Sequence, residues 1–362
     1  MRFVKKLLAF KSPFNLLKKF VFIFTSFNLV ANALGQEVEK LSLESSYGFI
    51  IPHSQALKPL SQSNPLGFSL HYQKLNQSQK SWDACNCFHY LGLQFSYHDF
   101  GNPPVLGHAL SLTGTFEPIL WKNERWTFSL LSGLGFSYLS KVYDEDNNPD
   151  NIFFSAPVSF LLFLSPKWEY IISDKIALNL SFAYNHISNG GQSQPNKGMN
   201  YPMLGLGLVH FMKNYPFPFY EKKMIPKSSN FYLETGLSTR EGEEGRIPNL
   251  SLVMAFKKPI SGINGIGGGL EINKDYSLEV ENKRWEALMP APFISHHFLF
   301  GKFDFSQRMA FYTNKPNNYH DFRFYQRYVL NYFLFQNFSI GIGLKAHGHV
   351  AEHLDLRLGW SF

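Results

Sequence analysis

Residues 182–200, FAYNHISNGGQSQPNKGMN, contain side chains of the types that acyl transfer requires. His186 and Ser188 are two positions apart in an alternating pattern that predicts a β-strand, so both are expected on one side of a sheet. Cβ atoms at this spacing are roughly 6–7 Å apart, so an imidazole nitrogen can reach a hydroxyl group. A serine nucleophile with a histidine base could therefore act here.

Asn189, Gly190 and Gly191 follow this pair directly. Glycines let the backbone turn and present N–H groups, and an asparagine amide can add a further donor. The stretch is thus a candidate oxyanion-binding turn. The alternative is a structural histidine with a serine at the end of its strand, because His-x-Ser occurs often by chance.

The predicted strand that carries the pair has two different sides. The side with His186 and Ser188 is otherwise apolar and contains Leu178, Leu180, Phe182 and Tyr184. The other side is small or polar and contains Ala177, Asn179, Ser181, Ala183 and Asn185. In a soluble protein this pattern would bury the pair in a core. In a membrane barrel, apolar side chains face lipid and polar ones face the lumen, so the pair would face the bilayer near its edge.

The amino-terminal segment has the pattern of an export signal. Its basic residues precede an apolar run, FVFIFTSFNLVANALG, which ends in the small-x-small sequence Ala31-Asn32-Ala33. We predict a signal peptide over residues 1–35. A membrane anchor is the alternative, but the run is short and contains Thr25, Ser26 and Asn28. The remaining chain has 28 basic and 27 acidic residues, so its charge gives no support to nucleic-acid binding.

The rest of the chain is typical of membrane-spanning strands. Aromatic residues make up 17% of the sequence, with 37 Phe and 18 Tyr, yet no later apolar run is long enough for a transmembrane helix. The last strand alternates between an apolar and a polar or small side, with Leu354, Leu356, Leu358, Trp360 and Phe362 on the apolar side. A soluble β protein is the alternative. We predict an all-β, antiparallel transmembrane barrel of the outer membrane, with about 12–16 strands in total.

The sequence contains two groups of potential metal ligands. Cys85 and Cys87 in DACNCF could be oxidised in an exported protein, and His89 alone would not complete a metal site with them. A loop feature without a catalytic role is the favoured interpretation. A second group, His347, His349, Glu352 and His353, is interpreted as part of a turn or a lumen in preference to a metal site. No metal or organic cofactor is expected.

The motif around His186 resembles that of the outer-membrane lipid A 3-O-deacylases, in the acyloxyacyl hydrolase group. The resemblance rests on HISNGG at 186–191, PNKG at 195–198 and Asn200, and it extends to YGFIIPHS at 47–54, GNPPVLG at 101–107 and NNPDN at 147–151. It covers roughly residues 45–212. It implies an eight-stranded barrel whose active site lies on the outer wall and faces lipopolysaccharide. We therefore expect a deacylase-like part over residues 36–212 and additional barrel strands over 213–362, which either enlarge the barrel or build a second unit.

Residue by residue, the resemblance makes His186 the base and Ser188 the nucleophile, and it places Asn189 and Asn196 near the oxyanion together with Gly190 and Gly191. The family has a glutamate four residues after the second asparagine, where this chain has Asn200. An amide oxygen can orient the imidazole, but it cannot stabilise an imidazolium as a carboxylate does. Asn200 could orient His186 by itself, a carboxylate elsewhere such as Glu169 or Asp174 could serve, or activity could be lost.

The predicted function is an outer-membrane serine esterase of a Gram-negative bacterium that removes an ester-linked acyl chain from lipid A. Its expected partner is lipid A or lipopolysaccharide in the outer leaflet. The alternative is a non-enzymatic outer-membrane barrel, porin-like or structural, that retains the motif.

Overall fold

The computed structural model describes residues 36–190, 193–222, 229–242, 245–261, 263–278, 288–316, 319, 321–348 and 350–362. The signal peptide predicted over residues 1–35 lies outside the described residues, and so do Gly191 and His349.

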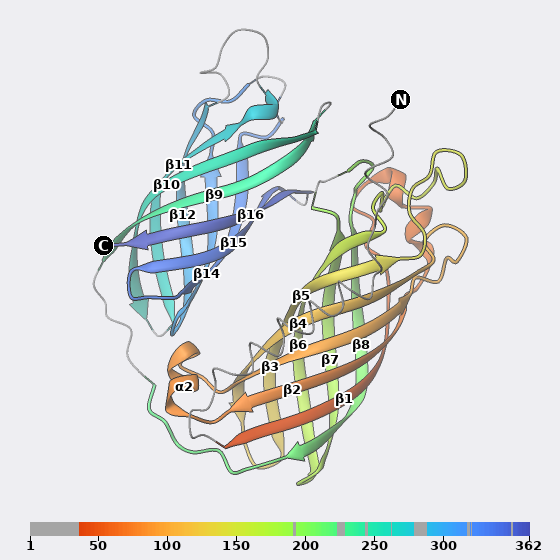
Figure 1. Ribbon diagram of the computed structural model, residues 1–362, viewed down its shortest axis with the longest axis vertical. Coiled ribbons are helices and arrows are strands. Elements are labelled where there is room, and N and C mark those ends of the chain that lie inside the picture. The colour runs from red at the N-terminus through yellow and green to blue at the C-terminus, as the bar shows by residue number, and fades with distance from the viewer. Residues whose placement is uncertain are drawn as a thin grey trace, which may run out of the picture. The chain divides into compact units, whose positions relative to one another are not determined.

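The first eight strands form a closed antiparallel barrel, in which each strand pairs with the next and β1 pairs with β8 (Figure 1). They are β1 (Glu37–Gly48), β2 (Leu66–Asn76), β3 (His89–Asp99), β4 (His108–Lys122), β5 (Trp126–Leu139), β6 (Val158–Ser173), β7 (Ile176–Ser188) and β8 (Met199–Lys213). Helix α2 (Gln79–Cys85) connects β2 to β3, and two 3-10 helices, η3 (Gln55–Leu57) and η4 (Leu60–Gln62), lie between β1 and β2.

The remaining strands form a second closed antiparallel barrel, in which β16 pairs with β9. They are β9 (Asn230–Gly242), β10 (Gly245–Ser261), β11 (Asn264–Asp275), β12 (Leu288–Phe300), β13 (Phe303–Phe311), β14 (Phe324–Phe333), β15 (Phe338–His347) and β16 (Val350–Ser361), with the 3-10 helix η5 (Tyr276–Leu278) after β11. The prediction of an antiparallel barrel protein with about 12–16 strands is confirmed, and the later strands close on themselves as a second unit.

The outward sides of both barrels are apolar, as the alternation predicted. In β7, Leu178, Leu180, Phe182 and Tyr184 are 41–47% exposed, whereas Asn179, Ser181 and Asn185 are buried inside the barrel. In β16, Leu356, Leu358 and Trp360 are exposed, and the residues between them point inward. Among the described residues, no helix is long and apolar enough to span a membrane.

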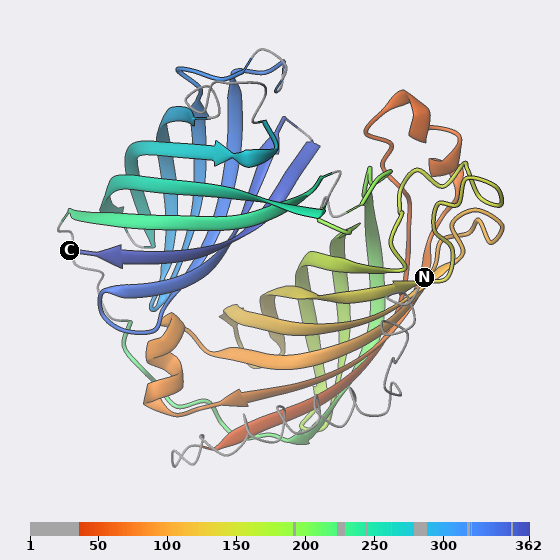
Figure 2. The ribbon, with the colours of Figure 1, turned by 45° about the horizontal axis from the view of Figure 1, so that its top comes forward.

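The two ends of the first barrel differ. One end has the connections over residues 49–65, 100–107, 140–157 and 189–198. The other has the connection over 77–88 and two short turns, 123–125 and 174–175, so the connections at the first end are longer on average. Figure 2 shows α2 at the end opposite the 49–65 connection. The end with the longer connections also holds an apolar core of buried side chains, which includes Leu57, Phe100, Phe153, Phe154, Ile187, Met199 and Tyr201.

Buried ion pairs cross the lumen of the first barrel. Lys40 Nζ lies 2.7 Å from Glu169 and 3.5 Å from Glu117, and Lys167 Nζ lies 2.9 Å from Glu169. Gln73 and Ser129 each donate a 2.6 Å hydrogen bond to Glu117. Two lysines thus balance two glutamates, which is the arrangement that buried charges need in order to persist.

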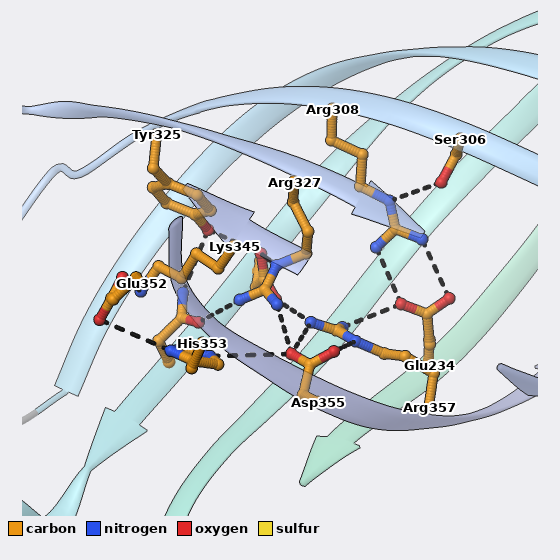
Figure 3. A network of polar contacts seen from close by, with 12 residues as sticks. Glu234, Ser306, Arg308, Tyr325, Arg327, Lys345, Glu352, His353, Asp355 and Arg357 are labelled. Atoms are coloured by element: carbon orange, nitrogen blue, oxygen red, sulfur yellow. Dashed lines mark hydrogen bonds and ion pairs between the residues drawn. The ribbon is translucent and has the colours of Figure 1, made fainter. Parts of the chain in front are cut away.

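The lumen of the second barrel holds a larger network of the same kind (Figure 3). Arg357 contacts Glu234 at 2.9 Å, Glu271 at 3.2 Å and Asp355 at 2.7 Å. Arg308 forms two parallel 2.9 Å bonds with Glu234, and Arg327 bonds Glu271 and Asp355. The cluster of His347, Glu352 and His353 is also buried in this lumen, where Lys345 lies 3.3 Å from Glu352.

We predict that Arg357→Met destabilises the second barrel by about 3–5 kcal/mol, because it leaves three carboxylates short of a cation in a buried site. The measurement is urea unfolding of the full-length protein in detergent, followed by loss of the heat-modifiable form on gels. The control is Arg323→Met, which removes an exposed arginine and should leave the unfolding midpoint nearly unchanged. Equal midpoints for the two variants would contradict a stabilising role of the network.

Candidate active site

The carboxyl end of β7 places His186 and Ser188 on the outside of the first barrel. Both are half-buried, and they continue the outward row that includes Phe182 and Tyr184. Ile187, between them, is fully buried in the apolar core. This inward residue fixes the direction of its two neighbours, because successive strand side chains point to opposite faces.

Strand pairing places Asn200 directly beside His186. The two residues are partners in the register of β7 and β8, and His186 Nδ1 lies 2.6 Å from Asn200 Oδ1. The amide oxygen is an acceptor, so Nδ1 carries the proton and Nε2 is the basic nitrogen. The Asn200 backbone is held as well, since its carbonyl accepts a 2.8 Å bond from the N–H of Ile51.

Two donors converge on the Ser188 hydroxyl. The Asn196 amide nitrogen lies 3.0 Å from Ser188 Oγ, and the Gly190 backbone N–H donates to the same oxygen at 3.1 Å. Gly190 has φ +70°, a conformation that glycine adopts without strain. If Ser188 attacked an ester carbonyl, both donors would lie close to the oxyanion that forms there.

The Asn189 side chain takes a different direction. Its amide nitrogen donates to Ser155 Oγ at 3.1 Å and to the Ser193 carbonyl at 2.9 Å, and the residue is only 3% exposed. Its backbone N–H donates to Asn196 Oδ1 at 3.3 Å, which turns the Asn196 nitrogen toward Ser188. The structure thus brings Gly190 and Asn196 to Ser188, while Asn189 supports Asn196.

The loop that carries Asn196 is fastened to the neighbouring loop. Backbone N–H groups of Lys197 and Gly198 donate to the carbonyls of Ile152 and Phe153 at 3.1 and 3.2 Å. The side chains of Asn148 and Asn151 in turn both donate to the Val105 carbonyl. The segments NNPDN (147–151) and GNPPVLG (101–107) were identified in the sequence only by family resemblance. In the structure, their hydrogen bonds support the loop that carries Asn196.

Hydrogen bonds within the 140–157 connection also affect the ionisation of Asp144. The backbone N–H and the side chain of Asn147 donate to the Asp144 carboxylate and lower the pKa of that carboxyl group. The loop is thus fixed by polar contacts that the sequence pattern did not predict.

The carboxylates considered as substitutes for the acid lie elsewhere. Glu169 is in the lumen with Lys40 and Lys167, and Asp174 is in the turn between β6 and β7, at the opposite end of the barrel. His53 follows β1 in the segment where Ile51 pairs with Asn200, so the chain after β1 runs beside the start of β8.

Two closed antiparallel barrels with apolar outer walls and polar, charge-filled lumens define an outer-membrane β-barrel protein. Residues 66–209 match the family described as Lipid A 3-O-deacylase (PagL), and residues 227–362 match the acyloxyacyl hydrolase C-terminal domain. These two matches together cover most of the chain, and the family resemblance seen in the sequence is confirmed.

Two of the solved structures that the chain resembles are similar to about half of it, at low identity. The outer membrane enzyme PagL is 14% identical, with a TM-score of 0.34, over 46% of this chain and 97% of that chain. Neisserial surface protein A is 11% identical, with a TM-score of 0.33, over 48% of this chain and 96% of that chain. No curated protein matches the chain.

We predict that Gly198→Ala displaces His186. Gly198 has φ +67°, and a Cβ atom there would lie 3.0 Å from His186 Cε1. The control is Gly348→Ala, which has φ +61° and open space around the added carbon, so both variants bear a similar backbone penalty of about 1–2 kcal/mol. Labelling of Ser188 by a phosphonate serine-hydrolase reagent should slow only in Gly198→Ala. Equal labelling of both variants would show that His186 tolerates the added methyl group.

Proposed function

We propose that this protein is an outer-membrane serine esterase that removes an ester-linked acyl chain from lipid A in the outer leaflet. The observation that carries the proposal is that a histidine, a serine and two hydrogen-bond donors to that serine lie on the outward side of the first barrel. His186 is oriented by Asn200, and Ser188 is contacted by Asn196 and the Gly190 N–H. The reaction is assigned to residues 36–212.

The proposed reaction follows the roles of these groups. The Ser188 hydroxyl rotates toward His186, Nε2 takes its proton, and Oγ attacks the acyl carbonyl carbon. The Gly190 N–H and the Asn196 amide donate to the oxyanion. The C–O ester bond then breaks, and the sugar alkoxide leaves with the proton from His186. Water, activated by the same nitrogen, hydrolyses the acyl-serine and releases a fatty acid.

The surface beside Ser188 suits an acyl chain. Phe160 is the register partner of Ser188 on β6, and its ring centroid lies 5.4 Å from that of Phe136 on β5. Val158 and Leu162, on the same outward row, are 59% and 40% exposed. An acyl chain that reaches Ser188 from the bilayer would therefore lie on apolar side chains.

The position of the site along the barrel suits the outer leaflet. His186 and Ser188 lie at the end with the longer connections. In outer-membrane barrels the longer loops are extracellular and the short turns are periplasmic. Lipid A would meet the site at this end.

The rival function, a porin-like channel, has less support. Buried lysines, arginines and carboxylates cross the lumens of both barrels and contact one another. A water-filled channel would instead leave such side chains hydrated. The following test distinguishes an esterase from a structural outer-membrane protein.

We predict that expression of the protein removes one acyl chain from lipid A and that Ser188→Ala abolishes this change. The measurement is mass spectrometry of lipid A from cells with the parent, the variant or neither. Ser181→Ala is the matched control, because Ser181 is on the same strand but faces the lumen. Unchanged lipid A with a correctly folded parent would favour the structural role.

We predict graded effects at Asn200. Asn200→Ala removes a neutral hydrogen bond worth about 1 kcal/mol and should lower the deacylation rate about fivefold. Asn200→Asp should raise the rate by a similar factor, because a carboxylate stabilises the imidazolium that forms in the transition state. The assay is deacylation of purified lipid A in detergent. A parental rate for Asn200→Ala, with His186→Ala inactive, would exclude Asn200 as the orienting group.

A further inference from the structure

Three potential metal ligands meet between β2 and β3, at the end of the first barrel opposite the candidate active site. Cys85 ends helix α2, and His89 begins β3. The two Sγ atoms and the histidine nitrogen all lie within 4.8 Å of one another, and Cys85 Sγ is 3.2 Å from His89 Nδ1. Cys85 and Cys87 form a disulfide in this structure.

The local backbone brings these side chains together. Asn86 is in the left-handed conformation, with φ 58°, and its N–H donates to the Trp82 carbonyl at 2.7 Å. This helix end reverses the chain within one residue, so Cys85 and Cys87 face each other and His89 comes within reach. From the sequence alone, His89 did not complete a metal site with the two cysteines, but the folded chain brings the three side chains together.

We propose that, when the disulfide is reduced, Cys85, Cys87 and His89 bind a zinc ion. Thiolate and imidazole are the ligands that zinc prefers, at about 2.3 Å for sulfur and about 2.0–2.1 Å for nitrogen. In a tetrahedral site these bond lengths separate sulfur and nitrogen by about 3.5 Å. The separation between Cys85 Sγ and His89 Nδ1 is close to this value, so one edge of the site is already formed.

The surroundings of the three ligands support this assignment. Cys85 is 2% and His89 7% exposed, whereas Cys87 is half-buried. The Phe88 ring packs against Trp82 and Phe217, with centroids 4.7 and 4.9 Å away. Two ligands are therefore held by packing, and the more accessible Cys87 can move outward after reduction. Water on its side supplies the fourth ligand of a three-residue zinc site.

Reduction of the Cys85–Cys87 disulfide and the binding of zinc are two separate steps, each with a balanced transfer of electrons or protons. A dithiol reductant transfers two electrons and two protons to the disulfide and is itself oxidised to a disulfide. Zinc then binds both sulfurs as thiolates and releases the two protons. The site lies in the 77–88 connection, at the end that also has the two short turns and would face the periplasm, so the redox state of that compartment would decide whether zinc binds.

The test uses the full-length protein folded in detergent, reduced under anaerobic conditions and freed of reductant. Co²⁺ serves as the probe, since thiolate coordination gives charge-transfer absorption, and Zn²⁺ should displace it. We expect one ion per reduced chain, release of two protons, and no binding by the oxidised chain. If the reduced parent gives no more thiolate absorption than the double variant Cys85→Ser/Cys87→Ser, the proposal is wrong.

The role of His89 is tested separately. His89→Gln should weaken zinc binding at least tenfold, while His108→Gln, at the opposite end of the barrel, should have no effect. Gel heat-modifiability confirms that each variant is folded. Unchanged affinity in His89→Gln would contradict a site made of two cysteines and a histidine. Neither variant changes a residue of the proposed esterase site.

Discussion

The pairing register of β7 and β8 is the constraint on which the candidate active site depends. A slip of one residue would turn His186 and Ser188 into the lumen and move Asn200 away from the imidazole. The register is secured by the inward residues Ile187, Met199 and Tyr201, which are fully buried in one apolar core. Packing inside the barrel thus fixes the positions of polar groups on the outside, where lipid hydrocarbon offers them no hydrogen bonds.

The parts of this structure that the sequence predicted are those governed by a period of two residues. Alternation identified the outward row of β7 and the outward row of β16, and it placed His186 and Ser188 on the lipid side. Which strands close each barrel was not predictable in the same way, because this depends on β1 meeting β8 and β9 meeting β16 across long stretches of chain. The direction of Asn189 and the contact of Cys85 with His89 also depend on loop conformations that no periodic pattern encodes.

A second group of side chains shows why location matters as much as geometry. In the lumen of the second barrel, Ser295 Oγ lies 3.0 Å from His297 Nε2, and His297 Nδ1 lies 2.7 Å from Asp304. This is the hydrogen-bond order of a serine hydrolase triad. All three residues are less than a tenth exposed, and Asp304 is paired with Lys257 at 2.5 Å. A lipid in the bilayer cannot reach them, so they are best understood as part of the lumen ion network.

The same comparison gives a physical reason for an amide beside His186. A carboxylate in the lumen is compensated by lysine or arginine, as Asp304 is, but no such cation faces His186 in the described contacts. On the lipid-facing wall an unpaired carboxylate would bear a desolvation cost of several kcal/mol, which a neutral amide avoids. The amide still fixes the imidazole tautomer, because its oxygen can only accept. In the proposed reaction the amide would not stabilise the imidazolium as a carboxylate does, so the resting site would gain stability at the expense of the transition state.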